Sequence, residues 1–109
     1  MRVLVVRPGE NPVVEEIGDE LRDMQTIVGG YIESIMPWED PVALICNEEG
    51  KINGLPLNRR LRDDDGRLID IIAGTFFLCY APPESENFLS LPDELIKKFS
   101  LIFRIFREG

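Results

Sequence analysis

The sequence of 109 residues contains no histidine, and this absence removes several kinds of chemistry at once. Ser-His and Cys-His nucleophilic pairs need an imidazole base, and imidazole is also a common zinc ligand in proteins. The chain also lacks a P-loop and the GxGxxG fingerprint of dinucleotide-binding folds. We therefore expect no metal site, no cofactor and, as the first hypothesis, no catalytic activity.

Cysteine is scarce as well, because Cys46 and Cys79 are the only two and each lies in an apolar segment. No CxxC pair accompanies them, so free buried thiols are favoured over a disulfide or a metal site. The longest apolar stretches are too short to span a membrane, and the first six residues resemble a strand more than a signal peptide. We therefore expect a cytoplasmic protein without a membrane partner.

Basic residues are few: 12 lysines and arginines stand against 20 aspartates and glutamates, which gives a net charge of −8. Nucleic-acid backbones and anionic bilayers attract cationic surfaces, so direct binding to nucleic acid or membrane is disfavoured. Solubility alone is the simpler explanation of so acidic a composition. The alternative is an acidic face that imitates nucleic acid or docks on a basic partner.

The chain length and a hydrophobic content of 44% favour a single compact domain over residues 1–109. Apolar residues at strand spacing predict five main strands, at 2–6, 13–17, 31–36, 42–46 and 75–80, and the first two form a hairpin. The last of these segments is apolar throughout, which favours a central position in the sheet. The predicted fold class is α+β, with a mixed or antiparallel sheet of about five strands.

Two main helices complete the predicted fold, one after the second strand and one at the carboxyl terminus. The first begins at a cap on Asp19 and stops at the glycine pair 29–30. Its apolar residues recur at helical spacing and predict one buried stripe, formed by Leu21, Met24, Ile27 and Val28. A capping box over 90–93 begins the second helix, which is expected to continue nearly to Gly109.

The second helix is unusually apolar for a chain end. Leu101, Phe103 and Ile105 widen its apolar surface beyond the stripe that one sheet face would need. Packing against the core is the favoured explanation. The alternative is a second copy of the chain, so that the protein forms a homo-oligomer through this helix.

The segment between residues 51 and 67 is harder to assign. Gly54 and Pro56 interrupt the first part, which predicts a bent segment, and residues 58–61 are expected to form one helical turn. Residues 62–67 then form an exposed loop. Its run 63–66 (DDDG) superficially resembles a calcium loop but lacks the spaced ligands and the terminal glutamate, so a solvated turn is favoured.

Three arginines stand out in so acidic a chain, at positions 59, 60 and 62 beside Asn58. Guanidinium groups suit phosphate and carboxylate, so this cluster predicts an anion site. The alternative is that the arginines pair with the acidic residues at 48–49 or 63–65.

The candidate site combines this cluster with polar residues and glycines that stand beside strand-like sequence. Asn58 and Arg59 would hold the anion, and Tyr31 would stack on the ligand. Hydrogen bonds would come from the remaining polar positions and from exposed backbone N–H groups at the glycine. The full predicted set is Tyr31, Glu33, Asn47, Asn58, Arg59, Asp70, Gly74 and Thr75. Carboxylate catalysis would need Glu33 and Asp70, or Glu33 and Glu48, in one cleft.

Three phrases together, GGYIE (29–33), CNEEGKINGLPLNR (46–59) and DIIAGTFFLC (70–79), resemble the family called domain of unknown function 3846. The resemblance extends from the first strand to about Cys79 and covers the last helix more loosely. That family occurs in small proteins of bacteriophages, plasmids and Gram-positive bacteria and brings no established activity. The resemblance therefore implies a context, that of a phage or mobile-element product in the bacterial cytoplasm.

In that context we expect a non-catalytic binding protein that captures a small anionic, nucleotide-derived signal and so helps to evade host defence. The alternative is an acidic inhibitor or DNA mimic that docks on a host enzyme. An enzyme that uses carboxylates ranks last.

Overall fold

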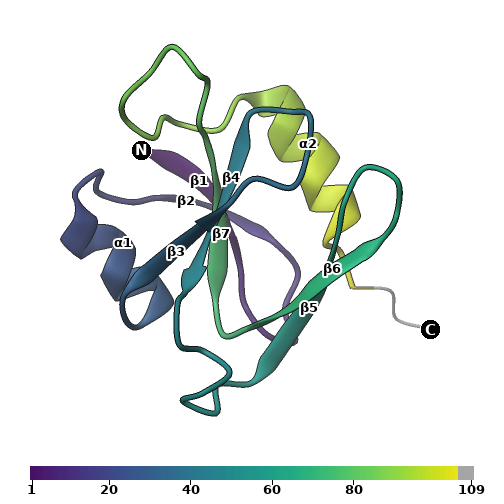
Figure 1. Cartoon of the computed structure of the whole chain (residues 1–109). Coiled ribbons are helices and arrows are strands. Elements are labelled where there is room, and N and C mark those ends of the chain that lie inside the picture. The colour runs from purple at the N-terminus through teal and green to yellow at the C-terminus, as the bar shows by residue number, and fades with distance from the viewer. Residues whose placement is uncertain (106–109) are drawn as a thin grey trace.

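A computed structural model gives the fold, and the structure describes residues 1–105. Its elements are, in chain order, β1 (Arg2–Val6), β2 (Val13–Glu16), α1 (Leu21–Val28), β3 (Ile32–Ile35), β4 (Val42–Asn47), β5 (Leu57–Arg62), β6 (Leu68–Ala73), β7 (Phe76–Tyr80) and α2 (Asp93–Ile102). Five strands form one sheet in the order β2-β1-β7-β4-β3, and β5 and β6 form a separate two-stranded hairpin. Every strand pair is antiparallel. The α+β class and the five-stranded sheet are confirmed, and β7 has the central position predicted for it (Figure 1).

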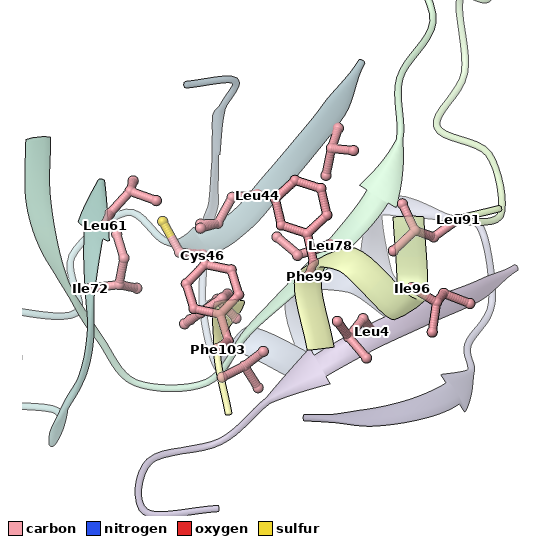
Figure 2. Packing of buried hydrophobic residues seen from close by; sticks show 13 residues of the cluster. Leu4, Leu44, Cys46, Leu61, Ile72, Leu78, Leu91, Ile96, Phe99 and Phe103 are labelled. Carbon is pink, nitrogen blue, oxygen red and sulfur yellow. The ribbon is translucent and has the colours of Figure 1, made fainter. Parts of the chain in front are cut away.

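The central strands are buried on both faces because side chains alternate between the two sides of a sheet. One face is covered by α2 and the hairpin, and the other by α1 (Figure 1). The α2 face buries Leu4, Val6, Val42, Leu44, Cys46, Leu61, Ile72, Phe76, Leu78, Leu91, Ile96, Phe99 and Phe103. The α1 face buries Val3, Val5, Met24, Val28, Ala43, Ile45, Phe77 and Cys79. Figure 2 shows Phe103 on the side of the cluster nearer Leu61 and Ile72 of the hairpin, and Phe99 beside Leu44 and Leu78.

Both cysteines are free and buried, as predicted. They lie on neighbouring strands but on opposite faces of the sheet, Cys46 toward α2 and Cys79 toward α1. Neither helix in the described part of the chain combines the length and the apolar content that a membrane crossing requires.

Helix α1 differs from its prediction at its beginning. Its N-cap is Glu20 and not Asp19, because Glu20 forms a capping box with Asp23, whose Oδ2 accepts the backbone N–H of Glu20 at 3.2 Å. Leu21 is 55% exposed and lies outside the buried stripe, which Met24 and Val28 form. The predicted stop is confirmed: Gly29 has a φ of 79° and donates its N–H to the oxygen of Gln25 at 2.8 Å.

Helix α2 was also predicted wrongly at both ends. Its N-cap is Pro92, and the hydroxyl of Ser90 accepts the backbone N–H of Arg2 at 2.8 Å instead of capping the helix. The helix ends at Ile102, and residues 103–105 are not helical. Phe103, the residue after the helix, is buried in the core. The rest of the predicted helix lies outside the described residues. Leu101 and Ile102 are exposed, and oligomerisation through this helix stays a prediction.

Residues 58–61 form part of strand β5, so the predicted helical turn is wrong. Pairing with β6 imposes the strand, and Leu61 is buried in the core between the exposed Arg60 and Arg62. The aspartate run then closes the hairpin. Asp63 Oδ1 accepts the backbone N–H groups of Asp65 at 3.0 Å and of Arg67 at 2.9 Å, which is a turn held by a side chain.

Candidate functional site

Arg59, which we predicted to hold an anion, joins three separate parts of the fold. Its Nε donates to the backbone oxygen of Phe103 at 3.0 Å, just after α2, and its Nη2 donates to the backbone oxygen of Glu10 at 2.6 Å, between β1 and β2. Its Nη1 donates to Asn58 Oδ1 at 2.8 Å. Desolvation by burial lowers the pKa of Arg59. Oxygens of the protein itself therefore take most of the donors that an anion would use.

Asn58 continues the same network on the other side of β5. Its Nδ2 donates to the backbone oxygens of Val6 and Gly74, each at 2.9 Å. These bonds join the hairpin to the end of β1 and to the turn between β6 and β7. Asn58 and Arg59 thus belong to one network, and the geometry gives them a part in holding the hairpin on the sheet.

Three of the other predicted residues line one cleft of about 230 Å³: Glu33 on β3, Asn47 at the end of β4 and Asp70 on β6. Asp70 forms an ion pair with Lys51, and Glu48 also lines the cleft. Three carboxylates and one ammonium group thus line the cleft, so this acidic cleft suits a cationic group better than an anion.

The acidic cleft depends on a close approach between the 48–54 loop and β6. A Cβ atom at Gly50 would lie 2.7 Å from the backbone oxygen of Ala73, so only glycine fits there. Asn47 is 8% exposed and holds the start of the loop: its Nδ2 donates to the oxygen of Val28 at 3.2 Å, and its Oδ1 accepts the N–H of Glu49 at 2.8 Å. Asn47 is therefore a structural wall of the cleft.

The remaining predicted residues lie elsewhere. Gly74 and Thr75 line a shallow, largely apolar groove of about 350 Å³ with Gly29 and Pro56. Tyr31 is 70% exposed and is not among the residues that line these clefts. The structure thus divides the predicted set among the acidic cleft, the apolar groove and the internal network, and Tyr31 stands apart from all three.

A larger groove of about 490 Å³ lies between the hairpin, the segment before β4 and α2. Its basic residues are Arg60 and Arg62 of β5 and Lys98 of α2, and its aromatic residues are Trp38 and Phe103. The ring of Trp38 packs against Phe99 with centroids 4.6 Å apart. We call this the basic groove, and sequence reasoning missed it as a site.

The acidic residues of the basic groove are already engaged by backbone donors. Asp63 holds the hairpin turn, and Asp64 Oδ2 accepts the backbone N–H of Glu39 at 2.7 Å. Lys98 pairs with Asp40, whose hydrogen bond raises the pKa of Lys98. Within residues 1–105, the guanidinium of Arg60 forms no hydrogen bond and no ion pair.

The arginine cluster itself was the signal that could have located the basic groove. On a strand, neighbouring side chains point to opposite sides, so Arg59 and Arg60 cannot serve the same site. Reading residues 58–61 as a helical turn concealed that separation. The predicted alternative, pairing of these arginines with Glu48, Glu49 or Asp63–Asp65, is found nowhere among the ion pairs of the described chain.

The described residues contain no group of three or more cysteine, aspartate or glutamate side chains that could hold a metal ion. Cys46 lines the acidic cleft, but burial raises its pKa to about 12, and the charges of Glu33 and Asp70 act in the same direction. At neutral pH it is therefore a thiol and a poor nucleophile.

Comparison with known proteins agrees with the phrases that suggested a family. No curated protein and no solved structure matches the chain. One family profile does match, and it covers residues 1–104, which includes the last helix. The chain therefore belongs to the family described as domain of unknown function (DUF3846).

Proposed function

We propose that this protein binds a small anionic, nucleotide-derived ligand without converting it, and that the basic groove is where the ligand lies. In the phage or mobile-element context implied by the family resemblance, such binding would sequester a host defence signal. The observation that carries the proposal is the free guanidinium of Arg60 in a groove with two further cations and an indole ring.

The side chains that line the basic groove carry three positive and two negative charges, whereas the whole chain carries −8. Its two aspartates keep their negative charge, but one oxygen of each already accepts hydrogen bonds from backbone N–H groups. Arg62 donates through Nη1 to the oxygen of Gly66 at 3.0 Å, which leaves its other donors for a ligand. A phosphate between Arg60 and Arg62 would gain charge-assisted hydrogen bonds.

The size and the walls of the groove favour a nucleotide over a bare ion. About 490 Å³ lies within the range of small-molecule sites. Trp38 is fixed by the hydrogen bond from its Nε1 to the oxygen of Arg62 at 3.0 Å and by its contact with Phe99. A fixed indole beside two guanidinium groups can contact a base or ribose while the arginines hold the phosphate.

Titration calorimetry with cyclic dinucleotides and ADP-ribose derivatives tests the proposal. We expect at least one of these ligands to bind, and Arg60→Ala to weaken it by about 10- to 100-fold, the usual value of hydrogen bonds to a charged group. Arg67→Ala is the matched control, since it removes the same charge from the same hairpin outside the groove. An absence of heat from every nucleotide, or equal losses in the two variants, would contradict the proposal.

An acidic inhibitor that docks on a host enzyme is the second candidate, and the acidic cleft favours it. Glu33, Glu48 and Asp70 line one cleft at an exposed end of the sheet. Affinity capture from host lysate, with Glu33→Gln as the comparison, tests it. A partner that binds both proteins equally would count against a role for this cleft.

Catalysis by carboxylates remains the last candidate. Glu33 and Asp70 do line the same cleft, which is the arrangement it requires. The hydrogen bond from Lys51, however, lowers the pKa of Asp70, so this carboxyl is ionised at neutral pH and unsuited to donate a proton.

A further inference from the structure

Strand β3 is the last strand on its side of the five-stranded sheet. Its partner β4 pairs Glu33 with Cys46, and the N–H of Glu48 donates to the oxygen of Tyr31 at 2.9 Å. In an antiparallel pair, hydrogen-bonded positions alternate along the strand. Tyr31 and Glu33 therefore direct their backbone groups toward β4, while Ile32 and Ser34 direct theirs away from it.

The outward backbone groups of Ile32 and Ser34 have no partner strand in the described part of the chain. An edge of this kind can pair with an extended peptide, whose main chain supplies the complementary donors and acceptors. Pro37 and the turn after β3 limit the edge to a short segment. The occupant is thus a few extended residues and not a long strand.

The negative charge of Glu33 indicates which residue type the docked peptide carries. Glu33 lies between the two outward residues, and its side chain is on the face that carries the acidic cleft, beside Cys46. A peptide residue opposite Glu33 would place its side chain on the same face. Opposite charges at facing positions stabilise a strand pair, and like charges destabilise it.

A second copy of the chain is disfavoured by the same residue. The antiparallel register that pairs Ile32 of one copy with Ser34 of the other places the two Glu33 residues opposite each other. Facing side chains at such positions are only about 5 Å apart, so the two carboxylates repel. Glu33 thus disfavours the self-pairing register that uses Ile32 and Ser34 of both copies, and it leaves the edge open to a basic strand.

We propose that the open edge of β3 is a docking site for an extended basic peptide segment of another protein, which adds to the sheet with a lysine or arginine opposite Glu33. This site is separate from the basic groove and does not depend on it. Main-chain pairing with Ile32 and Ser34 provides the attachment, and Glu33 provides the preference for a cation.

Two capped pentapeptides, TVKVT and TVEVT, test the proposal on the full chain by NMR titration. We expect TVKVT to shift the amide signals of Ile32 and Ser34 and to bind at least about five-fold more tightly than TVEVT. The difference should shrink in high salt, because the pair is solvent-exposed. Glu33→Lys should reverse the order of the two peptides.

Ser34→Pro provides a second test that does not involve charge. Proline removes the backbone N–H of residue 34, which points away from β4. An edge strand tolerates proline at such a position, so the fold should persist. TVKVT should bind about ten-fold more weakly to Ser34→Pro than to Ser34→Ala. Equal binding of the two peptides to the wild type, no effect of Ser34→Pro in a folded variant, or dimerisation through β3 would overturn the proposal.

Discussion

The two faces of the central sheet are covered in different ways. On one face, α1 is joined directly to β2 and β3, and it is held by its own caps and by apolar contacts such as that of Met24. On the other face, α2 and the β5–β6 hairpin come from distant parts of the chain (Figure 1). Polar contacts between distant residues hold them there, including those of Arg59 and of Trp38.

The difference explains where the charged clefts occur. Because α2 and the β5–β6 hairpin come from distant parts of the chain, clefts remain at the boundaries where they meet each other and the sheet. Polar side chains that bridge these boundaries line the clefts. The acidic cleft lies between the sheet and β6, and the basic groove between the hairpin and α2. The hairpin therefore separates an acidic surface from a basic one.

The largest expected effect is a loss of stability from removing the aromatic core under α2. Phe99 is fully buried and contacts the rings of Trp38 and Phe103. Phe99→Ala should lower the free energy of unfolding by about 3–5 kcal/mol, a large part of the total for a domain of this size. Met24→Ala on the α1 face is the comparison. Urea unfolding measures both, and a greater loss for Met24→Ala would break the contrast between the faces.

A smaller effect is expected when the polar contacts of the hairpin are removed. Arg59→Ala leaves the backbone oxygens of Phe103 and Glu10 without their donor and should cost about 1–3 kcal/mol. Arg59→Lys should restore little, because an ammonium cannot reproduce the planar fork. Thermal unfolding measures the change.

Arg60→Ala is the matched control for Arg59→Ala and should stay within about 0.5 kcal/mol of the wild type. Equal destabilisation by the two substitutions would show that the Arg59 network does not hold the hairpin. The same pair also separates stability from ligand binding, since only Arg60 lines the basic groove.

The contrast between the faces also shows what the sequence could predict. Local patterns located β1, β2 and the central β7, and Gly29 marked the end of α1. Strand β5 was missed because its conformation is imposed by pairing with β6 and by burial of Leu61, neither of which is a local signal. The prediction therefore failed mainly where distant segments meet.

The candidate site shows the same limit. Glu33 and Asp70 were chosen separately from the sequence, and the fold brings them to one cleft. Arg59 was chosen over Arg60 although the two point to opposite sides of a strand, and only the strand assignment distinguishes them. The tertiary structure decides which residues line the same cleft. Residue types in the sequence could therefore indicate the chemistry of a site but not which residues form it.

The smallest expected effect compares local opening of the two faces through their thiols. Cys46 lies at the floor of the acidic cleft, while Cys79 is buried under α1. If α2 and the β5–β6 hairpin open more readily than α1, Cys46 in a Cys79→Ala variant should react with iodoacetamide faster than Cys79 in a Cys46→Ala variant. The expected difference is about three- to ten-fold. Equal rates would show that the two faces of the sheet open equally readily.

The dependence of that reaction on pH and on urea identifies its route. Burial raises the pKa of Cys46 and of Cys79 to about 12, from an ordinary value of 9.0. Raised pKa values mean that the folded state holds more protons, so stability is intact below pH 9 and falls as the pH rises toward 12. Below pH 9, labelling of either thiol rises with pH, since the thiolate is the reacting form. Above pH 9, labelling through rapid reversible opening should continue to accelerate toward pH 12, because the falling stability populates the opened state, and direct attack on Cys46 in the closed cleft should accelerate in the same way. The two routes differ in urea: opening exposes surface, so labelling through an opened state should become faster at low urea concentrations. A rate for Cys46 that does not change with urea would show that the cleft admits the reagent without the hairpin moving.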